Sequence, residues 1–155
     1  MKTLNRRHAI GLLASTALMA SVPMVSMAVA ATKITVHKTP WCGCCTGWAA
    51  HLRRAGFDVT EVKHDDLNPI RKLMGVPASL TSCHTAEVEG YAIEGHVPAA
   101  DIRKLLATRP DAAGLSVPGM PTGSPGMENG HSRDAYDVVL FSAKGMRVFN
   151  HYTAR

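Results

Sequence analysis

Hydrophobic and polar residues alternate over 33–37 and again over 57–63, and β-branched residues are frequent in both stretches. Such alternation predicts two β-strands. Between them, residues 46–55 place apolar side chains on one face at helical spacing, and Gly56 follows as a helix stop. The pattern therefore predicts a strand, a turn, a helix and a second strand in succession.

The pattern continues with short elements and one long irregular segment. Residues 111–130 combine glycine, proline and methionine without periodicity, which predicts a loop. The alternation of elements favours the α/β class, with a central mixed sheet flanked by helices and a long Gly/Pro/Met loop before a C-terminal hairpin. The other expected elements are a short helix at 66–74, a hairpin of 85–90 with 91–94, a helix at 99–107, and a terminal hairpin of 136–141 with 147–149.

The N-terminal segment has the composition of an export signal. A basic stretch at 2–7 precedes an apolar stretch over 9–22, and small residues at 28–30 suit cleavage. A membrane anchor is the alternative, but the unbroken apolar core is shorter than the ~20 residues that span a bilayer. We therefore expect a cleaved signal peptide at 1–30 and a single periplasmic domain at 31–155, with export by either the Sec or the twin-arginine route.

Charge argues against nucleic-acid and membrane partners. The whole chain has 17 basic and 12 acidic residues, but three of the basic residues and none of the acidic ones lie within 1–30. The mature chain is thus nearly balanced, and it contains no run of lysine and arginine. We expect no nucleic-acid binding and no membrane insertion after cleavage.

All four cysteines of the chain fall into two compact clusters. Cys42, Cys44 and Cys45 lie within four residues, and Cys83 stands apart beside a histidine. A structural disulfide framework would spread its cysteines to connect distant loops. A disulfide between the neighbours Cys44 and Cys45 would require a strained ring. Soft thiolates at this density favour a soft metal, so we predict a thiolate site for Cu(I), with zinc as the alternative.

The turn that carries the first three cysteines has the spacing of a thioredoxin-like fold. Trp41 precedes a Cys42-x-x-Cys45 motif between the first predicted strand and helix. A helix N-terminus lowers the pKa of such thiols, so they could attack disulfides or bind metals. A third thiol, Cys44, beside this pair would complicate two-electron thiol–disulfide exchange, but it adds a metal ligand. By analogy with that fold, Cys83 would take the place of its cis-proline and face the first cluster.

Other side chains could join or surround this site. His84 could ligate the metal or hydrogen-bond a ligating sulfur, unless the strand turns it away. His96 is interpreted first as a cap of the helix that follows it, and participation in the metal site is left open as the alternative. Met120 and Met127 could act as transient Cu(I) ligands only. The remaining histidines of the mature chain show no ligand spacing; they are His37, His51, His64, His131 and His151.

Several longer motifs occur in the order found in one family. On these motifs the chain resembles the CopG-like family of periplasmic copper-resistance proteins, from about 33 to 149. The resemblance implies a thioredoxin-like domain whose C-x-C-C and C-H motifs bind copper, as several ions bridged by shared thiolates. The motifs are Val36-His-Lys-Thr-Pro-Trp-Cys-Gly-Cys-Cys45, Gly75-Val-Pro77, Ser82-Cys-His-Thr85, Glu94-Gly-His-Val-Pro98 and the stretch 114–128.

These observations predict a periplasmic copper-binding protein that sequesters or relays copper, or changes its redox state, during metal stress. We expect Cys42, Cys44, Cys45, Cys83 and His84 to hold more than one Cu(I) ion. The alternative is a thiol–disulfide oxidoreductase with Cys42 as nucleophile and Cys45 as resolving thiol. Enzyme activity stays open, since no catalytic acid–base pair, phosphate loop or organic-cofactor motif is evident. Besides copper ions, other periplasmic copper-handling proteins are candidate partners.

Overall fold

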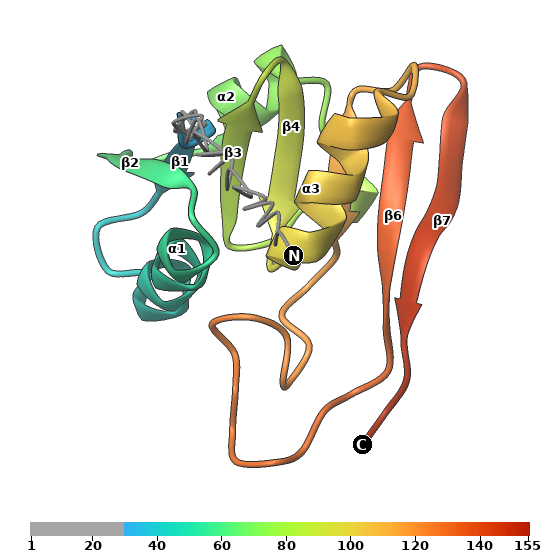
Figure 1. Cartoon of the computed structure of the whole chain (residues 1–155). Coiled ribbons are helices and arrows are strands. Elements are labelled where there is room, and N and C mark those ends of the chain that lie inside the picture. The colour runs from blue at the N-terminus through green and yellow to red at the C-terminus, as the bar shows by residue number, and fades with distance from the viewer. Residues whose placement is uncertain (1–29) are drawn as a thin grey trace, which may run out of the picture.

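The computed structural model describes residues 30–155, which form a seven-stranded sheet with helices on both faces (Figure 1). The predicted signal peptide at 1–30 lies outside the described residues except for its last position. Within the described range, no helix is long and apolar enough to cross a membrane. The elements are β1 (Lys33–Lys38), α1 (Gly43–Arg54), β2 (Asp58–Lys63), α2 (Asn68–Leu73), the 3-10 helix η1 (Ala78–Leu80), β3 (His84–Val88), β4 (Tyr91–Gly95), α3 (Ala99–Thr108), β5 (Gly114–Val117), β6 (Tyr136–Ser142) and β7 (Gly145–Tyr152).

The sheet is mixed, as predicted, with the strand order β2-β1-β3-β4-β5-β6-β7. β1 pairs with β2 and β4 with β5 in parallel, and the other neighbours are antiparallel. α1 and α3 pack on one face through the main hydrophobic core, while α2 and η1 lead into a smaller core on the other face. The face under α1 and α3 carries one row of buried residues in register, namely Val36, Ala86, Ile93, Leu115 and Leu140.

The turn between β1 and α1 positions the first three cysteines. α1 begins at Gly43, three residues before the predicted start, so the next two cysteines lie in its first turn. Cys42 is the N-cap residue, and its Sγ accepts a hydrogen bond from the Cys45 amide (3.3 Å). Trp48 is fully buried and donates from Nε1 to the Val97 carbonyl oxygen (2.8 Å). This bond fixes α1 against the chain segment that follows β4.

The expectation of an uninterrupted loop over 111–130 is wrong. Gly114–Val117 forms β5, a strand between β4 and β6. A Cβ on Gly114 would lie 1.9 Å from the carbonyl oxygen of Ala92, so glycine permits the close approach to β4. All four residues of β5 are buried, and the strand therefore lacks the polar alternation that marks a half-buried strand.

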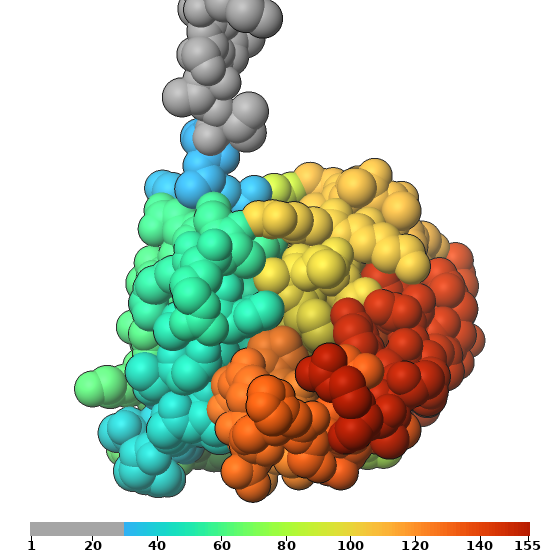
Figure 2. Space-filling view, turned by 60° about the horizontal axis from the view of Figure 1, so that its bottom comes forward, coloured from blue at the N-terminus to red at the C-terminus, as the bar shows by residue number. Residues whose placement is uncertain are grey.

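The irregular segment after β5, residues 118–135, lies against α1. Figure 2 shows it in orange between the teal α1 region and the red C-terminal strand. Gly126 makes the closest approach, since a Cβ there would lie 2.5 Å from Trp48 N and 2.7 Å from the Cys44 carbonyl oxygen. Its φ of +85° also favours glycine. The loop thus covers part of the helical turn that carries the cysteines.

Replacing Gly126 by alanine is expected to loosen this loop from α1. The added methyl group would overlap backbone atoms of α1, which should cost about 1–3 kcal/mol of unfolding free energy beyond the strain of the left-handed backbone. Gly130→Ala is the matched control, because Gly130 also has a positive φ (+63°) but open space around its Cβ. Urea unfolding measures both variants. Equal losses would show that packing at Gly126 does not hold the loop.

Candidate metal centre

The four cysteines converge at the N-terminus of α1. One sulfur from each residue lies within 4.8 Å of the others, although Cys83 is far from the rest in sequence. The Cys44 sulfur lies 3.5 Å from Cys42 Sγ and 3.7 Å from Cys83 Sγ. The structure therefore brings together all four cysteines that the sequence analysis selected, and it places Cys83 opposite the first cluster.

Two of these cysteines are joined. Cys42 and Cys45 form a disulfide, while Cys44 and Cys83 are free thiols. Cys42 is partly accessible and Cys45 is fully buried. A disulfide sulfur is a poor metal ligand compared with a thiolate, so the full four-thiolate set requires reduction by two electrons. The centre thus combines a disulfide-bonded pair with two free thiols.

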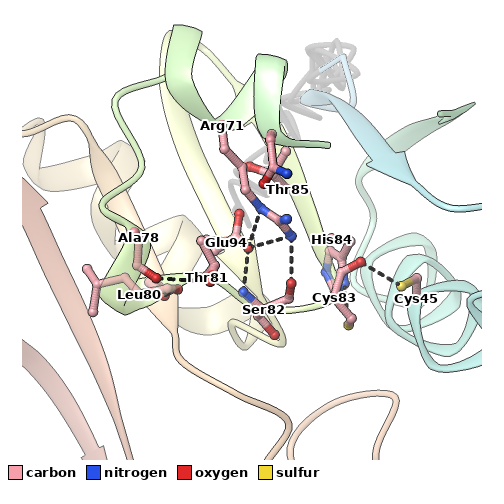
Figure 3. A network of polar contacts seen from close by, with 12 residues as sticks. Cys45, Arg71, Ala78, Leu80, Thr81, Ser82, Cys83, His84, Thr85 and Glu94 are labelled. Atoms are coloured by element: carbon pink, nitrogen blue, oxygen red, sulfur yellow. Dashed lines mark hydrogen bonds and ion pairs between the residues drawn. The ribbon is translucent and has the colours of Figure 1, made fainter. Parts of the chain in front are cut away.

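Cys83 is held in an environment that disfavours a free thiolate. Burial raises the pKa of the Cys83 thiol to about 12, and the adjacent Cys44 sulfur acts in the same direction. Its carbonyl oxygen lies 3.6 Å from Cys45 Sγ, as Figure 3 shows. A thiol of this kind is a weak nucleophile near neutral pH, but a bound cation would offset the cost of ionising it.

Two histidines complete the surroundings of Cys83. His84 places Nδ1 3.3 Å from Cys83 Sγ, and its ring lies tilted against Trp48 with centroids 4.3 Å apart. His96 places Nε2 3.1 Å from the same sulfur, and its Nδ1 lies 2.8 Å from the Pro125 carbonyl oxygen. Since a carbonyl can only accept, Nδ1 of His96 donates and its Nε2 carries a lone pair toward the sulfur.

The interpretation of His96 as a helix cap is wrong. The amide of Ala99 at the start of α3 donates instead to His51 Nε2 (3.2 Å). His96 forms with Cys83 and His84 a second group whose candidate ligand atoms lie within 4.8 Å of one another. Burial lowers the pKa of both His84 and His96, so both rings are neutral and able to donate a lone pair to a metal at neutral pH.

Two buried side-chain atoms have no hydrogen-bond partner among the described residues, and one of them belongs to this centre. They are His84 Nε2 and Glu94 Oε2. An unpaired buried ring nitrogen costs free energy unless a ligand satisfies it. His84 is fully buried, with Nδ1 beside Cys83 Sγ and Nε2 left without a partner within residues 30–155.

A buried ion pair fixes the backbone immediately before Cys83 (Figure 3). Arg71 of α2 donates to Glu94 of β4 (Nε–Oε1 3.0 Å) and to the Ser82 carbonyl oxygen (2.6 Å). The same Glu94 oxygen accepts from the Ser82 amide (2.6 Å). Both backbone groups of Ser82 are thus occupied, so this network sets the position from which Cys83 enters the centre.

The other side chains considered in the sequence analysis lie outside the cysteine and histidine cluster or at its edge. Met120, in the loop, has 54% of its surface exposed, and Met127 is half-buried. Trp41, next to the first cysteine, is 74% exposed. His37 and His64, for which the sequence showed no ligand spacing, adjoin each other on another part of the sheet.

Comparison with solved structures identifies the family. Two structures match, both named copper resistance protein CopG and distinguished as Form 1 and Form 2. Each is 47% identical to this chain, with TM-scores of 0.76 and 0.75, and each match covers 79% of this chain and 98% of the other. The chain belongs to the CopG family of copper resistance proteins. A family model described as "Protein of unknown function, DUF411" matches residues 80–127 of this CopG-family chain, and no curated protein matches.

Membership in the CopG family confirms the resemblance that the sequence motifs indicated. The name of the matching structures refers to copper resistance, so copper is the first metal to consider for the cysteine centre. Copper-resistance relatives and a cysteine cluster able to hold a metal together support a copper-related function.

Proposed function

We propose that the reduced chain binds Cu(I) through Cys42, Cys44, Cys45 and Cys83, with His84 as a ligand or as a hydrogen-bond partner of a ligating sulfur. The convergence of four sulfur atoms within 4.8 Å carries this proposal. Cu(I) accepts two or three thiolates, and one thiolate can bridge two ions. Four sulfurs this close together can therefore hold more than one Cu(I), whereas a single zinc ion would use all four in one tetrahedron.

The biological role that follows is handling of copper in copper resistance, by sequestration, relay or change of redox state. The export signal predicted at 1–30 would deliver the protein to the periplasm. There, tight thiolate binding would lower the concentration of free copper, or would pass the ion on to another copper-handling protein.

A second candidate function is thiol–disulfide exchange, and the disulfide itself favours it. The pair joins a partly accessible cysteine, Cys42, to a fully buried one, Cys45. In such an arrangement Cys42 would attack a substrate disulfide and Cys45 would resolve the mixed disulfide. The same pair could instead supply two electrons to copper, with two thiolates forming a disulfide while two Cu(II) ions become two Cu(I) ions.

Metal content and free thiols, measured on one sample, distinguish the two functions. The reduced chain is loaded anaerobically with Cu(I), freed of weakly bound metal, and analysed for copper. We expect two or more Cu(I) ions per chain and four free thiols after the copper is stripped. Absence of retained copper, with two thiols lost to the Cys42–Cys45 disulfide, would contradict copper binding and would favour exchange.

A further inference from the structure

His37 and His64 form a pair of histidines that the cysteine centre does not use. His37 lies near the end of β1, and His64 directly follows β2. Because β1 and β2 run in parallel with Lys38 opposite Lys63, their carboxyl ends coincide and the two rings meet. His37 Nδ1 lies 2.9 Å from His64 Nε2, and the ring centroids are 5.0 Å apart.

This pair lies on the opposite face of the sheet from α1. Lys38 directs its amine to Thr46 of α1 and to Glu61, so the preceding side chain of β1 points to the other face. His37 is thus separated by the sheet from the cysteines at the start of α1. Both histidines are partly accessible to solvent, which leaves a path for an ion.

The two ring nitrogens are spaced for a shared cation. Bonds from imidazole to a first-row metal are about 2.0–2.1 Å, so two ligands at right angles would have their nitrogens about 2.9 Å apart. The observed separation is 2.9 Å. A hydrogen bond between two ring nitrogens needs one of them as acceptor, so at least one ring is neutral. Burial, followed by the neighbouring His64, lowers the pKa of His37.

A carboxylate on the adjacent strand adds negative charge to this location. Glu87 of β3 lies opposite Thr35, and Thr85 lies opposite His37, so Glu87 is diagonal to His37 across the β1–β3 pair. Its charge favours a cation beside the ring, and it acts on His37 in the direction opposite to burial. The two imidazoles form a nitrogen donor set with a carboxylate charge nearby, and this set differs from the thiolate set of the cysteine centre.

We propose that His37 and His64 form a second metal site, which binds a divalent first-row cation and prefers Cu²⁺. Imidazole nitrogens suit Cu²⁺, which also binds most tightly in the divalent first-row series. The site would hold copper in the oxidation state that the thiolate centre does not retain. It uses none of the residues of the proposed Cu(I) centre, so each proposal can fail without the other.

The test uses Cu²⁺ and a chain that has no free thiol. The mature C44S/C83S variant keeps the Cys42–Cys45 disulfide, so no thiol remains to reduce the added Cu²⁺. We expect one Cu²⁺ per chain, with an electron paramagnetic resonance spectrum that shows coupling to two nitrogens. His37→Gln and His64→Gln should each weaken binding by more than about tenfold, since even a change around a ligand lowers metal affinity by about 10–100-fold. His131→Gln, at an exposed loop position, is the matched control and should leave the affinity unchanged.

A second measurement covers the case in which the doubly substituted chain does not fold. The unsubstituted chain, with its Cys42–Cys45 disulfide kept and its two free thiols alkylated, is titrated with Cu²⁺, and line broadening is followed by nuclear magnetic resonance. Signals of Val62 and Thr85, which pair with His37, should broaden first. Binding that survives both His37→Gln and His64→Gln, or broadening centred on His96, would overturn the proposal.

Discussion

Replacing Cys44 by serine is expected to abolish multinuclear Cu(I) binding while leaving the Cys42–Cys45 pair intact. Cys44 Sγ lies 3.5 Å from Cys42 Sγ and 3.7 Å from Cys83 Sγ, close enough to both for a bridging role between two ions. A serine oxygen is a hard ligand that Cu(I) disfavours. We expect copper content to fall to at most one ion per chain, and affinity to fall by more than the ~10–100-fold typical of changes around a ligand.

The matched control for this substitution is Gly43→Ala in the same turn. A Cβ on Gly43 would meet no atom within 4 Å, and the change leaves every thiol in place. Copper content is measured for both variants after anaerobic loading, and insulin reduction measures thiol–disulfide exchange. If the Cys44→Ser protein keeps full copper content and loses only exchange activity, Cys44 does not bridge copper and the proposed cluster is wrong.

Local sequence pattern was enough to predict the part of the centre that lies in one turn. The strand before Cys42, the helix after it and the Cys-x-Cys-Cys spacing place three thiols at one helix end. The position of Cys83 needed an analogy with another fold, because it depends on the antiparallel pairing of β3 with β1. That pairing is set by packing over the whole sheet, and no local signal specifies it.

The position of His96 beside Cys83 could have been predicted from the sequence. The hairpin of β3 and β4 turns at Glu89 and Gly90, as predicted, and pairs Thr85 with Glu94. Extending this register by two residues places His96 opposite Cys83. The predicted turn was therefore sufficient to bring the histidine to the thiol, whereas reading the residue only against the following helix led to the wrong role.

Two other features could not have been obtained from periodicity. β5 is four residues long and buried throughout, so it has neither the length nor the alternation of a recognisable strand. The His37–His64 contact joins residues 27 positions apart through a parallel pairing of β1 with β2. Parallel strands are linked by a crossover, and the register between them depends on how α1 packs, which sequence spacing does not reveal.

Removing the positive charge of Arg71 is expected to cause the largest loss of stability among the substitutions considered. Glu94 is fully buried, and Arg71 is its only cationic partner among the ion pairs of the described residues. Arg71→Met keeps most of the side-chain volume but leaves the carboxylate uncompensated. Breaking a buried pair in this way costs about 3–5 kcal/mol, so urea unfolding at pH 7.5 should show a loss of that size.

Two companion variants separate charge from packing. Arg71→Met combined with Glu94→Gln should recover most of the loss, because no buried charge remains and the amide oxygen can still accept from Ser82 N–H. Lys144→Met removes one partner of the Lys144–Asp111 pair, whose side chains are 80% and 86% exposed, and should cause no measurable change. A loss in the exposed-pair variant equal to that of Arg71→Met would contradict an effect of burial.

The pH dependence of the Arg71→Met variant tests the same mechanism independently. Burial raises the pKa of Glu94, while the Ser82 amide and Arg71 act in the opposite direction. Without Arg71 the pKa of Glu94 in the folded chain should rise further above its value in the unfolded chain, so the folded state would bind more protons. Stability relative to the parent chain should therefore increase as the pH falls from 7.5 to 5, because protonation removes the unpaired charge. If the defect were steric, the loss of unfolding free energy would not depend on pH. Copper content should recover together with stability only if the Arg71 network acts by positioning Cys83.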